Sequence, residues 1–238
     1  MVKKIFYLVV VSALFFTVSA IATPVFGLEQ IRVTWQKGEA SIGLTEKGPW
    51  HALTSGMPVA AGSFIKTGKD GMVELTMPDR SVVRLASDTL FKVNQALFPK
   101  DKLRRFSSRL FMGKMWAKVT AVFKGRRGTF NTSTPTAVAG VRGTTYNLTA
   151  GADNSTEIKV YEGQVGVGPP LIVEGGPKEE MAWPRQVSEE KWDEIILGKL
   201  QKLYIGPDGK PGKPVSFDPL EEKDEWVMLN QGRDALIR

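Results

Sequence analysis

Residues 110–124 read LFMGKMWAKVTAVFK, and this stretch is typical of a β-strand. Its odd-numbered positions are all apolar or glycine, whereas its even-numbered positions include three lysines. An amphipathic helix would need apolar residues three and four positions apart along one stripe, and this register does not provide them. We therefore expect one long strand with an apolar inner face and a cationic outer face, with Trp116 among the cations.

Shorter segments with the same period of two lie on both sides of this strand. Val73, Leu75 and Met77 alternate with polar residues, and Tyr146 and Leu148 alternate with threonine and asparagine. Such segments recur at intervals of roughly ten residues between turn-forming residues, which predicts an all-β domain. The expected fold is a wrapped β-roll, resembling a double-stranded β-helix, or a barrel of short strands.

The long strand lies inside a strongly basic segment. Residues 98–128 hold ten basic side chains and one acidic one, a local net charge of +9 in a chain whose formal charge is +7. This charge is either an ordinary solvated strand face or a docking surface for anionic lipid, an envelope polymer or an acidic protein. The predicted basic face comprises Arg109, Lys114, Trp116, Lys118, Lys124, Arg126 and Arg127.

The first 22 residues have the pattern of a secretory signal peptide. Lys3 and Lys4 precede an uncharged run from Ile5 to Ala22, and the run ends in small residues. We expect cleavage after this segment and export to the periplasm, where a protein seldom meets nucleic acid. The alternative is an inner-membrane anchor formed by residues 5–22, because about 18 apolar residues is the lower limit for spanning a bilayer. The chain would then be a membrane-tethered structural protein.

Composition removes most common catalytic and cofactor chemistry. The chain has no cysteine and a single histidine, His51, so it has neither a thiolate site nor a multi-histidine zinc site. We expect no metal, no cofactor and no catalytic residue. One enzymatic alternative stays open, an envelope glycan hydrolase, and it would need two carboxylates facing each other in a pocket.

The segment after residue 168 predicts a linker followed by helices. Residues 169–187 are rich in proline, glycine and glutamate. Ser188 precedes an apolar stripe that predicts a helix over 189–203. Asp218 is placed to cap a second helix that ends at Gly232. We expect these two helices to pack on the β domain, with binding of a partner as the alternative.

Two glycine-containing motifs resemble those of the FecR periplasmic domain family. One motif runs Gly140, Val141, Arg142, Gly143, Thr144, and it is similar to the Val-Arg-Gly-Thr signature of that family. The other is Glu162-Gly163, similar to the hairpin that closes the family's domain. Asp79-Arg80-Ser81 departs from the family pattern, which has Asp-Gly-Ser there. The resemblance extends over residues 30–168.

The resemblance implies a non-catalytic envelope module that contacts a protein or an anionic polymer. The best-known family members carry a cytoplasmic anti-sigma segment, one membrane helix and this domain outside. Only residues 1–4 precede the apolar run here, so the resemblance implies no sigma-regulating output. The expected division is a signal peptide 1–22, a FecR-like domain 30–168, a linker 169–187 and a helical extension 188–238.

The residues themselves suggest a role for the signature arginine. Gly140 and Gly143 flank Val141-Arg142, so the backbone can bend tightly there. The five donors of Arg142 could tie turn carbonyls together, which is the favoured interpretation, or bind an anionic group.

Overall fold

The computed structural model describes residues 30–99, 104–121, 128–170, 194–221 and 224–236. The predicted signal peptide and nearly all of the predicted linker lie outside these ranges, as do Lys124, Arg126 and Arg127. Their predictions stay untested.

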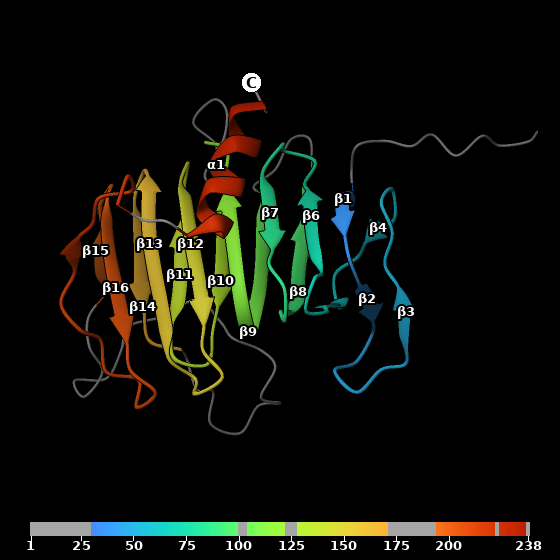
Figure 1. Ribbon diagram of the computed structural model, residues 1–238, viewed down its shortest axis with the longest axis horizontal. Helices are drawn as coiled ribbons and strands as arrows, with labels where there is room; N and C mark the ends of the chain where they lie inside the picture. Colours follow the sequence, from blue (N-terminus) through green and yellow to red (C-terminus); the bar gives the residue numbers. More distant parts are fainter. Residues whose placement is uncertain (1–29, 100–103, 122–127, 171–193, 222–223, 237–238) are drawn as a thin grey trace, which may run out of the picture.

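The described ranges form seventeen strands and one helix (Figure 1). The first half of the chain contributes β1 Ile31–Lys37, β2 Ala40–Gly43, β3 Trp50–Ala52, β4 Pro58–Val59, β5 Phe64–Thr67, β6 Met72–Thr76, β7 Val82–Leu85, β8 Leu90–Leu97 and β9 Arg105–Lys118. The second half contributes β10 Thr129–Ser133, β11 Val138–Val141, β12 Thr145–Ala150, β13 Thr156–Glu162, β14 Val165–Gly168, β15 Ile195–Leu197, β16 Gln201–Ile205, β17 Val215–Ser216 and α1 Glu225–Leu236. The prediction of a mostly β chain is confirmed.

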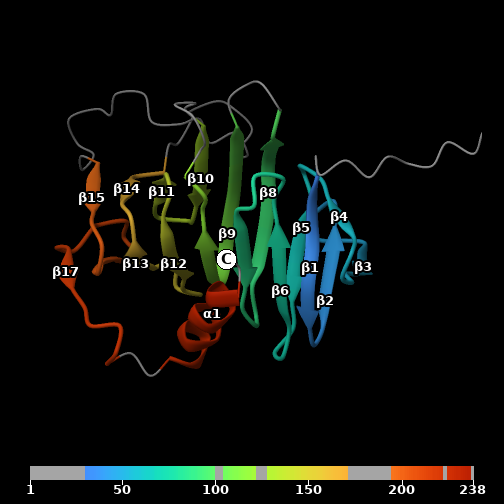
Figure 2. The same cartoon turned by 90° about the horizontal axis from the view of Figure 1, so that it is seen from above.

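The strands pair in two layers that share β9, and we call these layers sheet A and sheet B (Figure 2). Sheet A has the order β4-β1-β6-β7-β9-β12-β13-β16-β17. Sheet B has the order β3-β2-β5-β8-β9-β10-β11-β14-β15. The pairs are antiparallel except β9 with β10, which is parallel. The result is an open mixed sheet, so the predicted barrel is wrong.

One hydrophobic core joins the inner faces of the two sheets. Val73 and Leu75 of sheet A belong to the same buried cluster as Ile65 and Phe91 of sheet B. In the central strands, alternate side chains enter this core, because successive side chains of a strand point to opposite faces. The remaining side chains form two outer faces, one on each sheet.

Strand β9 changes from one sheet to the other at Gly113. Residues 105–112 pair with β8 in sheet B, and residues 113–118 pair with β12 in sheet A. Gly113 has φ +101°, and a Cβ at this position would lie 2.6 Å from the Cα atom of Thr89. Only glycine combines this backbone conformation with such a close approach.

Because of this change of sheet, the faces of the long strand differ from the prediction. Met115 and Ala117 are fully buried, as the alternation predicts. Before Gly113 the phase is reversed, because Leu110 is buried while Phe111 lies on the outer side. The irregularity at the crossover shifts the alternation by one residue, so no single face runs along the strand.

The predicted helix over 189–203 is wrong where the structure describes it. Its second half forms β15 and β16, joined by a turn in which Leu200 has φ +60°. Leu197 and Leu203 enter the core from these strands, whereas Ile196 is exposed. Both sheets therefore continue past residue 168, because β15 pairs with β14 in sheet B and β16 pairs with β13 in sheet A.

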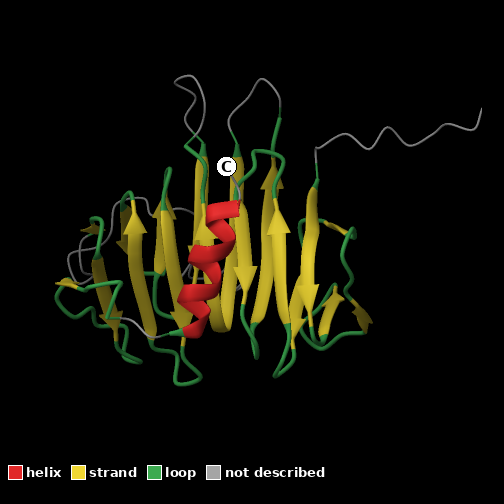
Figure 3. Cartoon of the chain, turned by 45° about the horizontal axis from the view of Figure 1, so that its top comes forward, coloured by secondary structure: helices red, strands yellow, loops and turns green. Residues whose placement is uncertain are grey.

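The second predicted helix exists but starts and ends later than expected. Asp218 accepts a hydrogen bond from Leu220 N in a turn, while Asp224 caps the helix by accepting one from Trp226 N at 2.9 Å. The helix α1 continues through Gly232 to Leu236. It packs on the outer face of sheet A, across β9 and its neighbours (Figure 3). Within the described ranges no helix is long and apolar enough to cross a bilayer.

Candidate functional site

A small second core fastens α1 to sheet A. Trp226 and Val227 of the helix pack against Ala86, Trp116 and Tyr161 of the sheet, and all five are buried. The rings of Trp116 and Tyr161 have centroids 4.6 Å apart. Burial of these aromatic surfaces is what holds the helix in place. The predicted docking of the C-terminal helix is therefore confirmed for α1.

A buried charge network lies between the helix and the sheet. Arg84 of β7 is 1% exposed, and its Nε donates to Glu74 Oε2 of β6 at 2.7 Å. The Nη1 of Arg84 donates to Asp234 Oδ1 of α1 at 2.6 Å. One buried cation thus bridges two carboxylates, one from the sheet and one from the helix. Such a bridge fixes the position of α1, because moving the helix would leave a buried charge unpaired.

Glu74 is the acidic centre of this network. It also accepts hydrogen bonds from Thr34 at 2.8 Å and from Arg233 at 3.0 Å. Burial raises the pKa of Glu74, but the hydrogen bonds and charges of Arg84, Thr34 and Arg233 outweigh burial and hold the pKa below its ordinary value. Glu74 is therefore ionised at neutral pH. The guanidinium of Arg233 also lies 4.2 Å from the ring centroid of Trp35.

The helix and its cap also contact the cations of β9 that lie on sheet A. Lys114 Nζ lies 3.1 Å from Asp224 Oδ2, and Lys118 Nζ donates to the backbone carbonyl of Asp234 at 3.1 Å. Trp116 is 1% exposed, and its Nε1 donates to Asp234 Oδ2 at 3.0 Å. These three members of the predicted basic face are therefore engaged by the protein's own helix.

Arg109 lies on the opposite side of the molecule. It precedes Gly113 in β9, so it points out of sheet B, whereas Lys114 and Lys118 point out of sheet A. The structure divides the described part of the predicted basic face between two outer faces. The prediction of a single cationic face is therefore wrong, and the physical reason is the phase change at Gly113.

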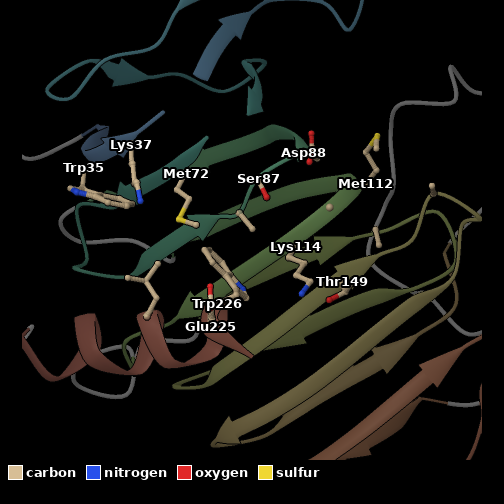
Figure 4. A pocket seen from close by; sticks show the side chains of 15 residues that line it. Trp35, Lys37, Met72, Ser87, Asp88, Met112, Lys114, Thr149, Glu225 and Trp226 are labelled. Atoms are coloured by element: carbon tan, nitrogen blue, oxygen red, sulfur yellow. The ribbon is translucent and has the colours of Figure 1, made fainter. Parts of the chain in front are cut away.

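An open groove of about 740 Å³ lies beside the first turn of α1 (Figure 4). Its apolar lining comes from Trp35 and Met72 of sheet A, Met112 of β9, and Trp226 and Leu229 of the helix. Trp226 is fixed there, because its Nε1 donates to Asn147 Oδ1 at 2.9 Å. The groove can therefore receive an apolar group against side chains that are already in place.

Charged groups of both signs line the same groove. Lys37, Lys114, Asp88 and Glu225 are among its lining residues. Figure 4 shows Asp88 and Glu225 on different sides of the groove, with Lys114 and Trp226 between them. The two carboxylates do not point toward one another, as paired acid–base groups of a glycan hydrolase would. Among the described residues, no three His, Asp or Glu side chains lie close enough to hold a metal ion.

The two glycine motifs of the sequence meet at one junction. Gly143 has φ +63° and Gly163 has φ +81°. A Cβ on Gly163 would lie 2.6 Å from the carbonyl oxygen of Gly143, so the two turns touch at their glycines. Thr144 is buried there and donates to the carbonyl of Gln164 at 2.8 Å. Gly143 and Thr144 of the signature therefore lie where the two turns contact each other.

Arg142 does not take part in this junction. Its side chain is exposed, and its guanidinium donates no hydrogen bond to a residue of the described ranges. Gly140 pairs with Gly166 in sheet B, and Val141 is buried. Glu162 accepts a hydrogen bond from Thr145 at 3.3 Å. The loop-tying role that the sequence favours for Arg142 thus finds no support in these contacts.

The network of Arg84, Glu74 and Asp234 was missed by sequence reasoning. A signal was present for two of its members, because Glu74 and Arg84 lie in register across the turn between β6 and β7. Opposite charges facing each other on neighbouring strands predict a pair. Asp234 carried no such signal, since its contact depends on where the helix docks.

Comparison with known proteins supports the family resemblance. The profile of the family described as FecR protein matches residues 63–166, which confirms the predicted resemblance for that stretch. No curated protein matches the chain.

Two solved structures are similar to the chain, and each is a crystal structure of a candidate anti-sigma factor from Parabacteroides distasonis ATCC 8503. Both are 17% identical to the chain, with TM-scores of 0.46 and 0.42. The matches cover 71% and 65% of this chain, which spans 65% and 59% of the lengths of those two proteins.

Proposed function

We propose that this chain, which carries a FecR domain over residues 63–166, is a signalling-related interaction module of the cell envelope. It acts by binding and not by catalysis. The partner is an envelope protein or an anionic envelope polymer, and the chain works in the periplasm after removal of residues 1–22.

The FecR match is the observation that carries this proposal. It covers strands from β5 to β14 and therefore the central part of both sheets. Geometry adds support, because the groove beside α1 offers fixed aromatic and methionine side chains with charges of both signs. Fixed groups of this kind suit recognition of a partner. The carboxylates of the groove lie apart, which does not favour the alternative of a glycan hydrolase.

The location is tested by fractionating cells that express the full chain. We expect the protein in the periplasmic fraction, with Thr23 as its first residue by N-terminal sequencing. Recovery from the inner-membrane fraction with the first 22 residues attached would contradict periplasmic release and favour the anchored form.

The binding role is tested with the purified mature chain and envelope extracts. We expect a protein or polymer partner to be retained by the immobilised chain and no cleavage of envelope glycan. The matched variants are Asp88→Asn and Glu225→Gln, which remove the two groove carboxylates without changing their size. Glycan cleavage that either variant abolishes would overturn the proposal in favour of the hydrolase.

A further inference from the structure

The outer face of sheet A presents a set of polar groups to α1. Five side chains of the sheet contact a residue of the helix or its cap, and we call them the α1 seat: Glu74, Arg84, Lys114, Trp116 and Lys118. The seat carries three positive charges and one negative charge, and Trp116 adds a neutral donor. Charge complementarity therefore favours a helix that brings carboxylates to the seat.

The helix meets the seat along one stripe. Trp226, Asn230 and Asp234 are four residues apart in sequence, which places them on one face of a helix. Trp226 packs in the small aromatic core, Asn230 Oδ1 lies 3.3 Å from Arg84 Nη1, and Asp234 pairs with the same guanidinium. The seat therefore recognises an aromatic anchor that is followed by polar acceptors one and two turns later.

The seat is not completely satisfied by α1. The Nη2 of Arg84 is buried and has no hydrogen-bond partner, although Nε and Nη1 of the same guanidinium are both bonded. A buried donor without an acceptor is costly. The open groove of about 740 Å³ is lined by Leu229 of the helix together with Met72 and Met112 of the strands, so space also remains beside the first turn. A helix with a further acceptor and larger apolar side chains would fit the seat better.

The main core of the molecule does not depend on α1. The FecR match ends at residue 166, whereas α1 begins at Glu225. The large hydrophobic cluster between the two sheets contains no residue of the helix. Met228 is 62% exposed and Leu236 is 85% exposed, so Trp226 and Val227 are the apolar side chains that the helix buries. Exchange of α1 for another helix would therefore leave the main core intact.

We propose that the α1 seat is the binding site for a partner protein, which presents an acidic amphipathic helix in place of α1. This inference rests on the proposed binding function and names the surface and the partner class. The partner helix places an aromatic residue where Trp226 lies and a carboxylate where Asp234 lies. Because the incoming carboxylate replaces that of Asp234, Arg84 keeps a charged partner after the exchange. The helix α1 is then a resident competitor that occupies the seat until the partner binds.

The test adds the synthetic peptide of residues 218–236 to the mature chain and measures binding. In the wild type, the tethered α1 competes at an effective concentration on the order of millimolar, so micromolar peptide should bind weakly. The variant Trp226→Ala loosens α1 and leaves the seat unchanged, and it should bind the peptide about tenfold more tightly than the wild type. The milder variant Asp224→Ala should lie between the two.

The matched controls are changes in the peptide, because these cannot unfold the protein. Asp234→Asn in the peptide removes the partner of Arg84 and Trp116 and should weaken binding about tenfold. Asp218→Asn removes the same charge at an exposed residue that bonds within its own turn, so this peptide should bind like the native one. Equal weakening by both changes would overturn recognition by the seat. Absence of peptide binding to both release variants, shown to be folded by urea unfolding, would overturn it as well.

Envelope extracts separate the failure of this inference from the failure of the proposed function. We expect immobilised Trp226→Ala to retain more of a protein partner than the wild type does. The native peptide should elute that partner, and the Asp234→Asn peptide should not. A partner that both chains retain equally and that the native peptide does not elute would contradict the inference and leave the proposed function standing. Retention of an anionic polymer in place of a protein would overturn the partner class, whereas no retained partner at all would overturn the proposed function.

Discussion

Cations lie on both outer faces of this molecule, but α1 contacts only those of sheet A. On sheet A, Lys114 and Lys118 are paired with Asp224 and the carbonyl of Asp234, which α1 and its cap bring to them. On sheet B, Arg109 lies over Phe111, and no helix of the described ranges covers it. One strand, β9, supplies the cations of both faces.

The difference shows that a basic segment is not the same as a basic surface. Ten cations within 31 residues looked like one feature in the sequence. Among the described cations, the crossover at Gly113 places Lys114 and Lys118 on the face that α1 contacts and Arg109 on the other face. Charge becomes informative about binding only when its partners are known.

The largest expected effect comes from removing Arg84, the buried cation between sheet A and α1. The substitution Arg84→Ala leaves Glu74 and Asp234 without their shared cation, and removal of one partner of a buried pair costs about 3–5 kcal/mol. Urea unfolding of the mature chain measures this loss. The control is Arg142→Ala, which removes an exposed arginine and should change stability by less than about 0.5 kcal/mol. An equal loss in both variants would contradict the account of the network.

The second effect comes from the crossover that creates the two faces. The substitution Gly113→Ala places a Cβ against the backbone of Thr89 at a positive φ, and we expect a loss of roughly 2–4 kcal/mol. The matched control is Gly209→Ala, where φ is +77° but no atom lies within 4 Å of the added Cβ. Its loss should be about 1 kcal/mol, from the backbone conformation alone. Similar losses would mean that the close approach at Gly113 is unimportant.

The smallest effect comes from the first turn of α1. The substitution Asp224→Ala removes the helix cap and the ion pair with Lys114, which together contribute about 1–2 kcal/mol. The substitution Asp218→Ala removes only an exposed turn contact and should cost about 0.5 kcal/mol or less. Thermal unfolding of the two variants compares these carboxylates. A larger loss for Asp218→Ala would place the functional cap where the sequence predicted it.

The period of two predicted most of the β architecture correctly but could not predict where it changes phase. The burial of Met115 and Ala117 follows from alternation, whereas the reversed pattern around Leu110 depends on a bulge. Gly113 is compatible with either reading until the contact with Thr89 is known. The alternation therefore predicted the strand, but it did not predict which residues lie on each outer face.

The wrong helix over 189–203 has a related cause. Ile196, Leu200 and Leu203 fit a helical stripe by their spacing, yet the same segment also fits two short strands separated by a turn. Gly198 begins that turn, and a glycine inside a helix costs about 1 kcal/mol relative to alanine. Pairing with β14 and β13 decided the outcome, and such long-range contacts leave no local signal.

The candidate functional residues could likewise be predicted only where local sequence carries the information. The glycines 143 and 163 could be selected from the sequence, because backbone freedom is encoded in the residue type. The roles of Arg84, Asp234 and Trp226 could not, since they depend on how α1 docks. The contact of Arg109 with Phe111 was equally hidden, because the sequence predicts Arg109 for the basic face and Phe111 for the apolar one.

Lysine acylation read by mass spectrometry tests the contrast between the two faces most directly. The wild-type mature chain is compared with Trp226→Ala, which removes the main apolar anchor of α1. We predict that Lys118 reacts slowly in the wild type and several-fold faster in the variant, while the exposed Lys66 of sheet B reacts quickly and equally in both. A wild-type Lys118 as reactive as Lys66 would contradict the claim that α1 closes the cationic face of sheet A.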